Sequence, residues 1–216
     1  VDRAYPVPVQ DWKRLEDADG VSPLTGAEAR TIFLGFDQDR DELLYSSVKG
    51  KNPFKDQRVR QAFYQAIDVD AIHKTVMRGL SKPTAVNLPN PPVMGIPKEL
   101  DKRYPYDVNA AKKLLAEAGY PNGFELTIDC PNNRYINDEP ILQAIAAMWT
   151  RIGVNTRVAA SPMATPSKSH ASLPVPDLRI TGLELTQGIQ NNNNDVQLIQ
   201  GRRTFVKVRA RTDTFG

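Results

Sequence analysis

The chain has 216 residues, of which 40% are hydrophobic and 25% are charged, and its formal net charge is +3. This length suits one full domain or two small ones, and the composition is that of a globular protein, which excludes wholesale disorder. No apolar run approaches the roughly 20 residues of a membrane-spanning helix. The sequence opens at Val1 without a methionine or a signal segment, so we expect a processed form or a piece of a longer protein.

The charge is unevenly distributed along the chain. Residues 1–158 contain 21 basic and 21 acidic side chains, so the whole positive excess lies in residues 159–216. Such an asymmetry indicates that two different pieces of protein are joined. We predict an α/β domain over 1–158, a linker over 159–176 and a β segment over 177–216.

The first elements are a helix and a strand. Residues 9–15 suit a short helix in which Trp12 and Leu15 face a core. Residues 29–37 form a continuous apolar run with β-forming residues, which predicts a buried strand. A polar loop is expected over 38–52.

Helix N-caps are the next readable signals. Asp56 precedes apolar residues at helical spacing, and so does Asp107; Asp68 or Asp70 is in position to cap a further helix between them. The segment 83–105 is rich in proline, which excludes a helix or a central strand there.

A strand, a helix and a second strand follow one another near the end of the first domain. The strand is predicted at 124–130, the helix at 138–151 and the second strand at 154–158, after Gly153. A crossover of this length implies parallel pairing with a right-handed connection. The fold class predicted for residues 1–158 is therefore α/β.

The last part of the chain is different in character. Residues 159–176 are dominated by Pro, Ser and Ala, as in linkers. Strands are then predicted at 178–186, 196–199 and 204–210. A complete sandwich of this type needs about seven strands, so the β segment is predicted to be incomplete.

The tail could present several basic side chains to a polyanion. They lie between residues 202 and 211, where Phe205 is the single aromatic residue available for stacking on a base. The solvated outer face of a sheet is the favoured interpretation, and no nucleic-acid partner is predicted.

Signals for catalysis or metal binding are poor. His73 and His170 are expected on the surface, and Cys130 is expected in the core. The acidic run 37–41 opens like a calcium loop but lacks the required glycine and the final glutamate. Lys51 lacks the remaining residues of a phosphate-binding loop. We therefore predict no catalytic residues, no metal and no cofactor.

Several sequence segments, taken together and in order, resemble a known protein family. They are Tyr5–Pro8 with Leu15, Arg30–Asp37, Asn52–Phe63, Ala66–Asp68, Tyr106–Asp107, Ala110–Gly123 and Trp149–Val158. With this order and spacing, residues 1–158 resemble the extracytoplasmic solute-binding proteins that deliver peptides or nickel to ABC transporters. The tail resembles, over a short stretch, immunoglobulin-like adhesion modules of bacterial surface proteins.

The resemblance implies a partial lobe of a two-lobed binding protein, followed by an incomplete β-sandwich-like segment. The parent protein is then expected to capture an oligopeptide or a similar small solute for an ABC permease, without being an enzyme, in the periplasm or outside the cell. Peptide-binding relatives have an acidic residue for the peptide amino group, and this chain has none to match it. We expect the chain alone to bind peptide weakly or not at all.

Three candidate ligand-binding residues follow from the same resemblance. The stretch 30–37 resembles a strand that runs toward the ligand cleft, which makes Arg30, Phe33 and Asp37 candidates. The alternative is a core strand with polar ends.

Other interpretations stay open. The chain could be an extracellular interaction or assembly protein that uses its β tail, self-associating through the exposed lobe surface or through unpaired β edges. It could also be a chimera without selected function, with its two parents meeting near Val158, or an enzyme revealed by a screen of hydrolase substrates.

Overall fold

The computed structural model describes residues 6–26, 30–87, 95–97 and 99–162 together with the strands at 178–186 and 205–212. The chain divides into two units, Val1–Ser169 and His170–Gly216. In the first unit the elements are η1 (Val9–Asp11), α1 (Trp12–Glu16), η2 (Pro53–Lys55), α2 (Gln57–Gln65), α3 (Val69–Ala71), η3 (Ile72–Val76), α4 (Val108–Glu117), β1 (Glu125–Pro131), α5 (Asp138–Thr150) and β2 (Asn155–Ser161). The second unit contains β3 (Leu178–Thr186) and β4 (Phe205–Thr212). Mixed helices and a parallel strand pair confirm the α/β class.

Three aspartates begin the helices as the sequence predicts. The side chains of Asp56, Asp68 and Asp107 each accept a hydrogen bond from a backbone N–H in the first turn of α2, α3 and α4, respectively. Each bond satisfies a donor that a helix start otherwise leaves without a partner. The short helix near the N-terminus is also present, although Trp12 and Leu15 are only half-buried.

The parallel pair β1–β2 is the centre of the first unit. The strands pair in register from Glu125 with Asn155 to Pro131 with Ser161, and α5 makes the crossover between them. The prediction of parallel pairing is confirmed, and β2 continues three residues beyond Val158. Residues 45–47 lie along the other edge of β1, where the backbone N–H of Ser47 donates to the carbonyl of Glu125 at 2.9 Å.

Two glycines meet where β1 and β2 begin. Gly123 and Gly153 have φ angles of 71° and 84°, which only glycine adopts readily. A Cβ on Gly123 would overlap the carbonyl of Gly153, and a Cβ on Gly153 would lie 2.8 Å from the carbonyl oxygen of Asn122. The approach of these two turns requires glycine at both positions.

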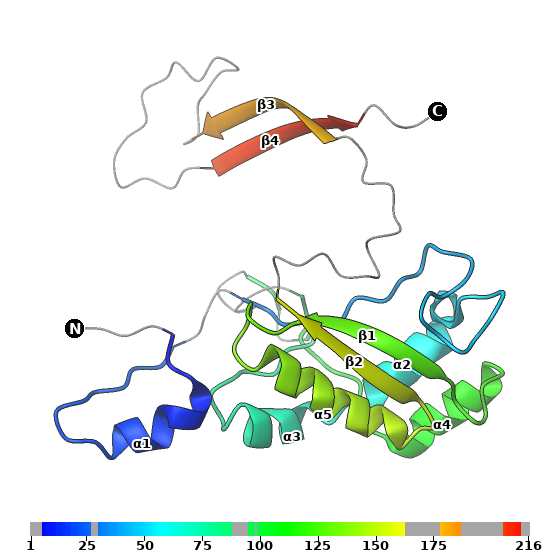
Figure 1. Ribbon diagram of the computed structural model, residues 1–216, viewed down its shortest axis with the longest axis horizontal. Coiled ribbons are helices and arrows are strands. Elements are labelled where there is room, and N and C mark those ends of the chain that lie inside the picture. Colours follow the sequence, from blue (N-terminus) through cyan, green and yellow to red (C-terminus); the bar gives the residue numbers. More distant parts are fainter. Residues whose placement is uncertain are drawn as a thin grey trace. The chain divides into compact units, whose positions relative to one another are not determined.

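Helices α3, α4 and α5 lie on one side of the β1–β2 pair (Figure 1). The core between the helices and the strands contains Phe63 of α2 and Trp149 of α5, whose ring centroids are 4.6 Å apart. Trp149 is 1% exposed, and its Nε1 donates to the carbonyl oxygen of Phe63 at 3.0 Å. This bond satisfies the indole N–H, so the largest side chain of the core is buried without an unpaired donor.

The buried strand predicted over 29–37 is wrong. Residues 30–37 form no strand, and Ile32 and Phe33 are 40% and 62% exposed. A strand needs a neighbour for its backbone groups, and no part of the chain that the structure describes pairs with this segment. Only Leu34 and Phe36 of this segment pack against the core, where the ring centroid of Phe36 lies 4.7 Å from that of Phe54.

Asn52 fixes the end of this extended segment. It is 6% exposed, and its Nδ2 donates to the carbonyl oxygens of Asp37 and Arg40 at 2.9 and 3.0 Å. Its Oδ1 accepts a hydrogen bond from the backbone N–H of Phe54 at 3.0 Å. One side chain therefore ties the turn at 37–40 to the start of η2.

The remaining connections agree with the sequence where they are described. The proline-rich segment 83–105 contains neither a helix nor a strand in its described residues. In the second unit, β3 and β4 are antiparallel, with an irregularity between Ile180 and Gly182. Two of the three predicted tail strands are thus confirmed, and the one predicted at 196–199 lies outside the described residues. The immunoglobulin-like character of the tail stays a prediction.

Candidate functional site

A groove of about 390 Å³ lies where β1 ends. It is lined by the loop that follows β1 and by two segments from the N-terminal part of the chain: Pro6, Val7, Pro8, Arg30, Asn133, Arg134, Tyr135, Ile136 and Asn137. Ligands of open α/β sheets bind beyond the carboxyl ends of parallel strands. The position of the groove therefore makes it the candidate site.

A buried carboxylate holds the loop of the groove. Asp138, the first residue of α5, is 4% exposed. Its Oδ2 accepts hydrogen bonds from the backbone N–H groups of Arg134 and Tyr135 at 3.0 and 3.1 Å, and its Oδ1 accepts one from Glu139 at 3.0 Å. The loop is consequently fixed to the start of α5 before any ligand arrives.

Asn137 connects the loop with two distant segments. It has a φ angle of 56°, a left-handed conformation that asparagine tolerates better than most residues. Its Oδ1 accepts from Nε2 of Gln10 at 2.8 Å, and its Nδ2 donates to the carbonyl oxygen of Val76 at 2.9 Å. The N-terminal segment and the end of η3 therefore meet at this loop.

The groove combines positive charge with apolar surface. Arg30 and Arg134 line it, and no acidic residue is among its lining residues. The guanidinium of Arg134 lies over the ring of Tyr135, 5.5 Å from the ring centroid, so the flat cation is supported from one side. Such a site suits an anionic group, because a guanidinium can donate two parallel hydrogen bonds to a carboxylate.

The structure separates the three predicted site residues. Arg30 lines the groove, whereas Phe33 and Asp37 are not among its lining residues. Asp37 accepts hydrogen bonds from the backbone N–H groups of Asp39 and Arg40 and pairs with the Arg40 guanidinium at 2.7 Å. Burial opposes ionisation of Asp37, but these hydrogen bonds and the Arg40 charge lower its pKa below the ordinary value. Asp37 therefore holds a turn.

Arg134 and Tyr135 were missed at the level of sequence. The sequence feature that could have identified them as site residues is their position in a polar loop directly after a strand of the predicted parallel pair. The resemblance directed attention to the stretch 30–37 instead, of which only the first residue reaches the groove.

A second hollow, of about 570 Å³, lies over the beginnings of β1 and β2. Its lining includes Tyr45, Glu125, Asn155 and Arg157 and is largely polar. It lies at the amino ends of the strands, opposite to the end that binds ligands in open α/β sheets. We therefore place the candidate site at the first groove.

Neither metal chemistry nor thiol chemistry is indicated in the described part of the chain. No group of three or more His, Cys, Asp and Glu residues is placed there to hold a metal ion. Burial, together with the nearby charges of Asp138 and Glu139, raises the pKa of the Cys130 thiol to about 11. The thiol is thus kept protonated at neutral pH, as in a core cysteine.

The family of the chain is decided by a comparison with family models. The model of bacterial extracellular solute-binding proteins, family 5 Middle, matches residues 1–198. The chain belongs to this family. The match extends past residue 158, where the resemblance visible in the sequence ends. The family description places this solute-binding protein outside the cytoplasm, and no helix in the described residues has the length and apolar character needed to cross a membrane.

Curated relatives agree with the family. The chain is 42% identical over 109 residues to heme-binding protein A of Haemophilus influenzae, which covers 49% of the chain and 20% of that protein. It is 29% identical over 157 residues to the glutathione-binding protein GsiB of Pectobacterium atrosepticum, which covers 73% of the chain and 28% of GsiB. The chain thus spans between a fifth and a third of the length of these relatives.

Solved structures show the same relationship. The periplasmic binding protein DppA of Helicobacter pylori, an ABC transporter-associated protein in complex with the peptide STSA, matches with a TM-score of 0.58 and 27% identity. That match covers 71% of this chain and 27% of DppA. The dipeptide-binding protein of Pseudoalteromonas sp. SM9913, in complex with Met-Leu, matches with a TM-score of 0.52 and 25% identity over 72% of this chain and 29% of that protein. The expected partial lobe of a solute-binding protein is confirmed.

Proposed function

We propose that the protein to which this chain belongs captures an oligopeptide or a similar small anionic solute and delivers it to an ABC permease, without enzymatic activity. The observation that carries this proposal is the groove beyond β1, where Arg30 and Arg134 bring positive charge to an otherwise largely apolar surface. The bound peptides of the two solved relatives support a peptide as the ligand class.

The groove suits one end of such a ligand. A peptide carboxylate would accept hydrogen bonds from the Arg134 guanidinium, and the adjoining side chain would pack on Tyr135 and Ile136. Arg30 would add a second positive charge, while Phe33 and Asp37 remain proposals without a place in the groove. Two-lobed proteins obtain much of their affinity from closure around the ligand. Since this chain covers only part of its relatives, it is expected to bind peptide weakly.

The test compares peptides that differ only in their C-terminal charge. A mixture of short peptides and the same mixture with amidated C-termini are titrated into the chain, and binding is followed by ligand-observed NMR, which detects weak complexes. Peptides with a C-terminal carboxylate are expected to bind roughly tenfold more tightly than the amidated peptides, because the carboxylate makes one additional charge-assisted hydrogen-bonded contact. The substitution Arg134→Gln is expected to remove the difference.

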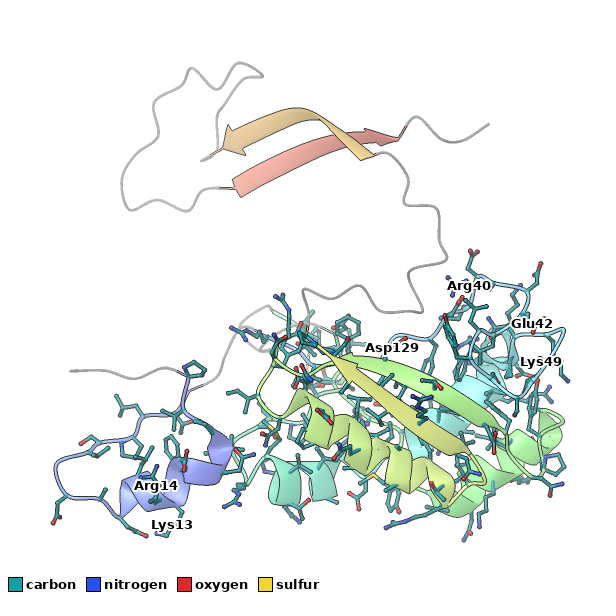
Figure 2. The ribbon with its side chains drawn as sticks, in the orientation of Figure 1. Lys13, Arg14, Arg40, Glu42, Lys49 and Asp129 are labelled. Carbon is teal, nitrogen blue, oxygen red and sulfur yellow. The ribbon has the colours of Figure 1, made fainter. Side chains whose placement is uncertain are left out.

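The matched control is Arg14→Gln on α1, an exposed arginine that forms a surface ion pair with Asp11 at 3.2 Å (Figure 2). This change should leave the difference between free and amidated peptides unaltered. Equal binding of both mixtures to the unsubstituted chain would refute the role of the groove in anion recognition. A dissociation constant in the low micromolar range for the isolated chain would refute the expectation of weak binding.

The division into a lobe over 1–158, a linker over 159–176 and a β module over 177–216 stays part of this proposal. A second candidate function is assembly through the tail, and the antiparallel pairing of β3 and β4 supports it. Deleting residues 177–216 separates the two, because solute binding by the groove should survive the deletion and assembly by the tail should not.

A further inference from the structure

The turn that leads into β1 contains a chemically reactive pair of residues. Asn122 is followed by Gly123, and this is the only Asn-Gly pair in the sequence. Asparagine is one of the thermally labile residues of proteins. A following glycine favours attack of its own backbone nitrogen on the asparagine side chain, because glycine has no Cβ to hinder the approach and lets the backbone bend toward it.

The two reacting groups have different environments in the folded chain. The side chain of Asn122 is exposed to solvent. The nitrogen that would attack it is held, because the backbone N–H of Gly123 donates to the carbonyl oxygen of Tyr120 at 3.0 Å. The amide that would be lost is therefore open to water, whereas its nucleophile is engaged in the turn.

Ring closure is excluded while this hydrogen bond is in place. The reaction replaces the hydrogen on the Gly123 nitrogen by Cγ of Asn122, at a bond length of about 1.4 Å. Cγ would then lie within about 2 Å of the Tyr120 carbonyl oxygen, whereas a carbon and an oxygen that are not bonded stay roughly 3.3 Å apart or more. The turn must open before the ring can form.

Contacts on both sides keep the turn closed. The ring of Tyr120 packs on Phe124, with centroids 5.1 Å apart, and Phe124 is buried. On the other side the backbone of Gly153 lies so close that a Cβ there would be 2.8 Å from the carbonyl oxygen of Asn122 and 3.3 Å from the nitrogen of Gly123. Opening of the turn therefore disturbs the place where β1 and β2 begin.

We propose that Asn122 is a deamidation site that the native turn protects, and that its isoaspartate product is excluded from the native fold. This proposal is independent of the solute-binding role. Once the turn is open, hydroxide removes the proton from the Gly123 nitrogen, whose electron pair forms a bond to Cγ of Asn122. The bond from Cγ to Nδ2 then breaks, and Nδ2 takes a proton from water and leaves as ammonia.

Water opens the resulting five-membered ring at either of its two carbonyl carbons. Addition at Cγ breaks the new bond to nitrogen and gives aspartate. Addition at the main-chain carbonyl carbon breaks the original peptide bond and gives isoaspartate, whose main chain runs through Cβ and Cγ. Both routes consume one water and release one ammonia, and isoaspartate leaves one additional carbon in the main chain.

The folded turn has no room for this carbon. A single Cβ on Gly123 would already overlap the carbonyl of Gly153. In isoaspartate the former main-chain carbonyl also becomes a charged carboxylate beside Gly153, where it loses part of its hydration. Aspartate keeps the original main chain, and its side chain occupies an exposed position. Chains with aspartate are therefore expected to fold, and chains with isoaspartate are not.

Incubation of the full chain at pH 8, in buffer and in guanidinium chloride, tests the protection. Peptide mass spectrometry measures the conversion of Asn122, which is expected to be roughly tenfold slower in buffer or slower still, because the hydrogen bond of the turn must break first. Asn109, which precedes Ala110, is the internal control and should convert slowly in both solutions.

Asn122→Gln is the matched variant, because the longer amide would need a six-membered ring, and it should show no conversion in guanidinium chloride. Equal rates for Asn122 in the two solutions would overturn the protection by the turn. Absence of conversion in guanidinium chloride would overturn the site itself.

Refolding tests the exclusion of the product. The chain is partly converted in guanidinium chloride, the denaturant is removed, and the compact monomer is isolated by size exclusion. Digestion with a protease that cleaves before aspartate but not before isoaspartate then separates the two products. Isoaspartate should be depleted roughly tenfold or more in the compact monomer, as expected for overpacking of a closed site.

Asn122→Asp supplies the matched control for the charge, and it should unfold at the same denaturant concentration as the unsubstituted chain. An undiminished share of isoaspartate in the compact monomer would overturn the proposed exclusion. Loss of folding in Asn122→Asp would overturn it as well, because the added charge would then be the cause.

Discussion

Replacement of Asn52 by alanine tests how the extended segment 30–37 is held on the domain. The buried side chain makes three hydrogen bonds, to the carbonyl oxygens of Asp37 and Arg40 and from the N–H of Phe54. Alanine leaves all three backbone groups without this partner. At roughly 1 kcal/mol for each group, the free energy of unfolding should fall by about 3 kcal/mol, a large part of the about 5–15 kcal/mol of a typical domain.

The assay is urea unfolding monitored by tryptophan fluorescence, because the emission of the buried Trp149 changes when the core opens. Asn109→Ala is the matched control, since Asn109 is exposed on α4. Alanine is the better helix former, so this change should be neutral or stabilising by a few tenths of a kcal/mol. A loss below about 1 kcal/mol in Asn52→Ala would show that water replaces the side chain, and would refute the reasoning.

Two further substitutions and one reaction test the remaining structure. Gly123→Ala should prevent stable folding of the first unit, because its Cβ would overlap the Gly153 carbonyl; Gly119→Ala has a comparable positive φ but open space around it, and should cost only about 1 kcal/mol in thermal unfolding. Equal losses in the two variants would contradict the role of the close approach. With its pKa raised to about 11, Cys130 should react with a disulfide reagent at pH 8 on the order of a hundredfold more slowly in the folded chain than in the urea-unfolded chain. The reaction rate of the folded chain should rise about tenfold for each unit by which the pH is increased toward that pKa, because the thiolate is the reactive form. Equal rates in the folded and unfolded chain would exclude burial of the thiol.

Local signals predicted most of the fold of the first unit. Helix caps and turn glycines depend on residues near them in the sequence, as at Asp56, Asp107 and Gly153. The structure confirms the two helices and the strand that begin after these residues. The parallel pairing of β1 with β2 could also be predicted, because the length of the crossover through α5 permits little else.

The failures concern partners that are distant in sequence. Residues 30–37 have the composition of a strand, but composition does not supply the neighbour that a strand requires, and Phe33 is consequently exposed. The candidate site was only partly predictable for the same reason. Arg30 and Arg134 are about a hundred residues apart, and their convergence depends on contacts such as that between Gln10 and Asn137.

The buried carboxylate of Asp138 affects when conformational entropy is lost. By accepting the N–H groups of Arg134 and Tyr135, it orders the loop of the groove during folding. A ligand that binds there meets a backbone whose freedom has already been given up, so little of the binding free energy is spent on ordering it. In the peptide complexes that we propose, the loop would keep one shape, and differences in affinity between peptides would come from the contacts of their side chains with the groove.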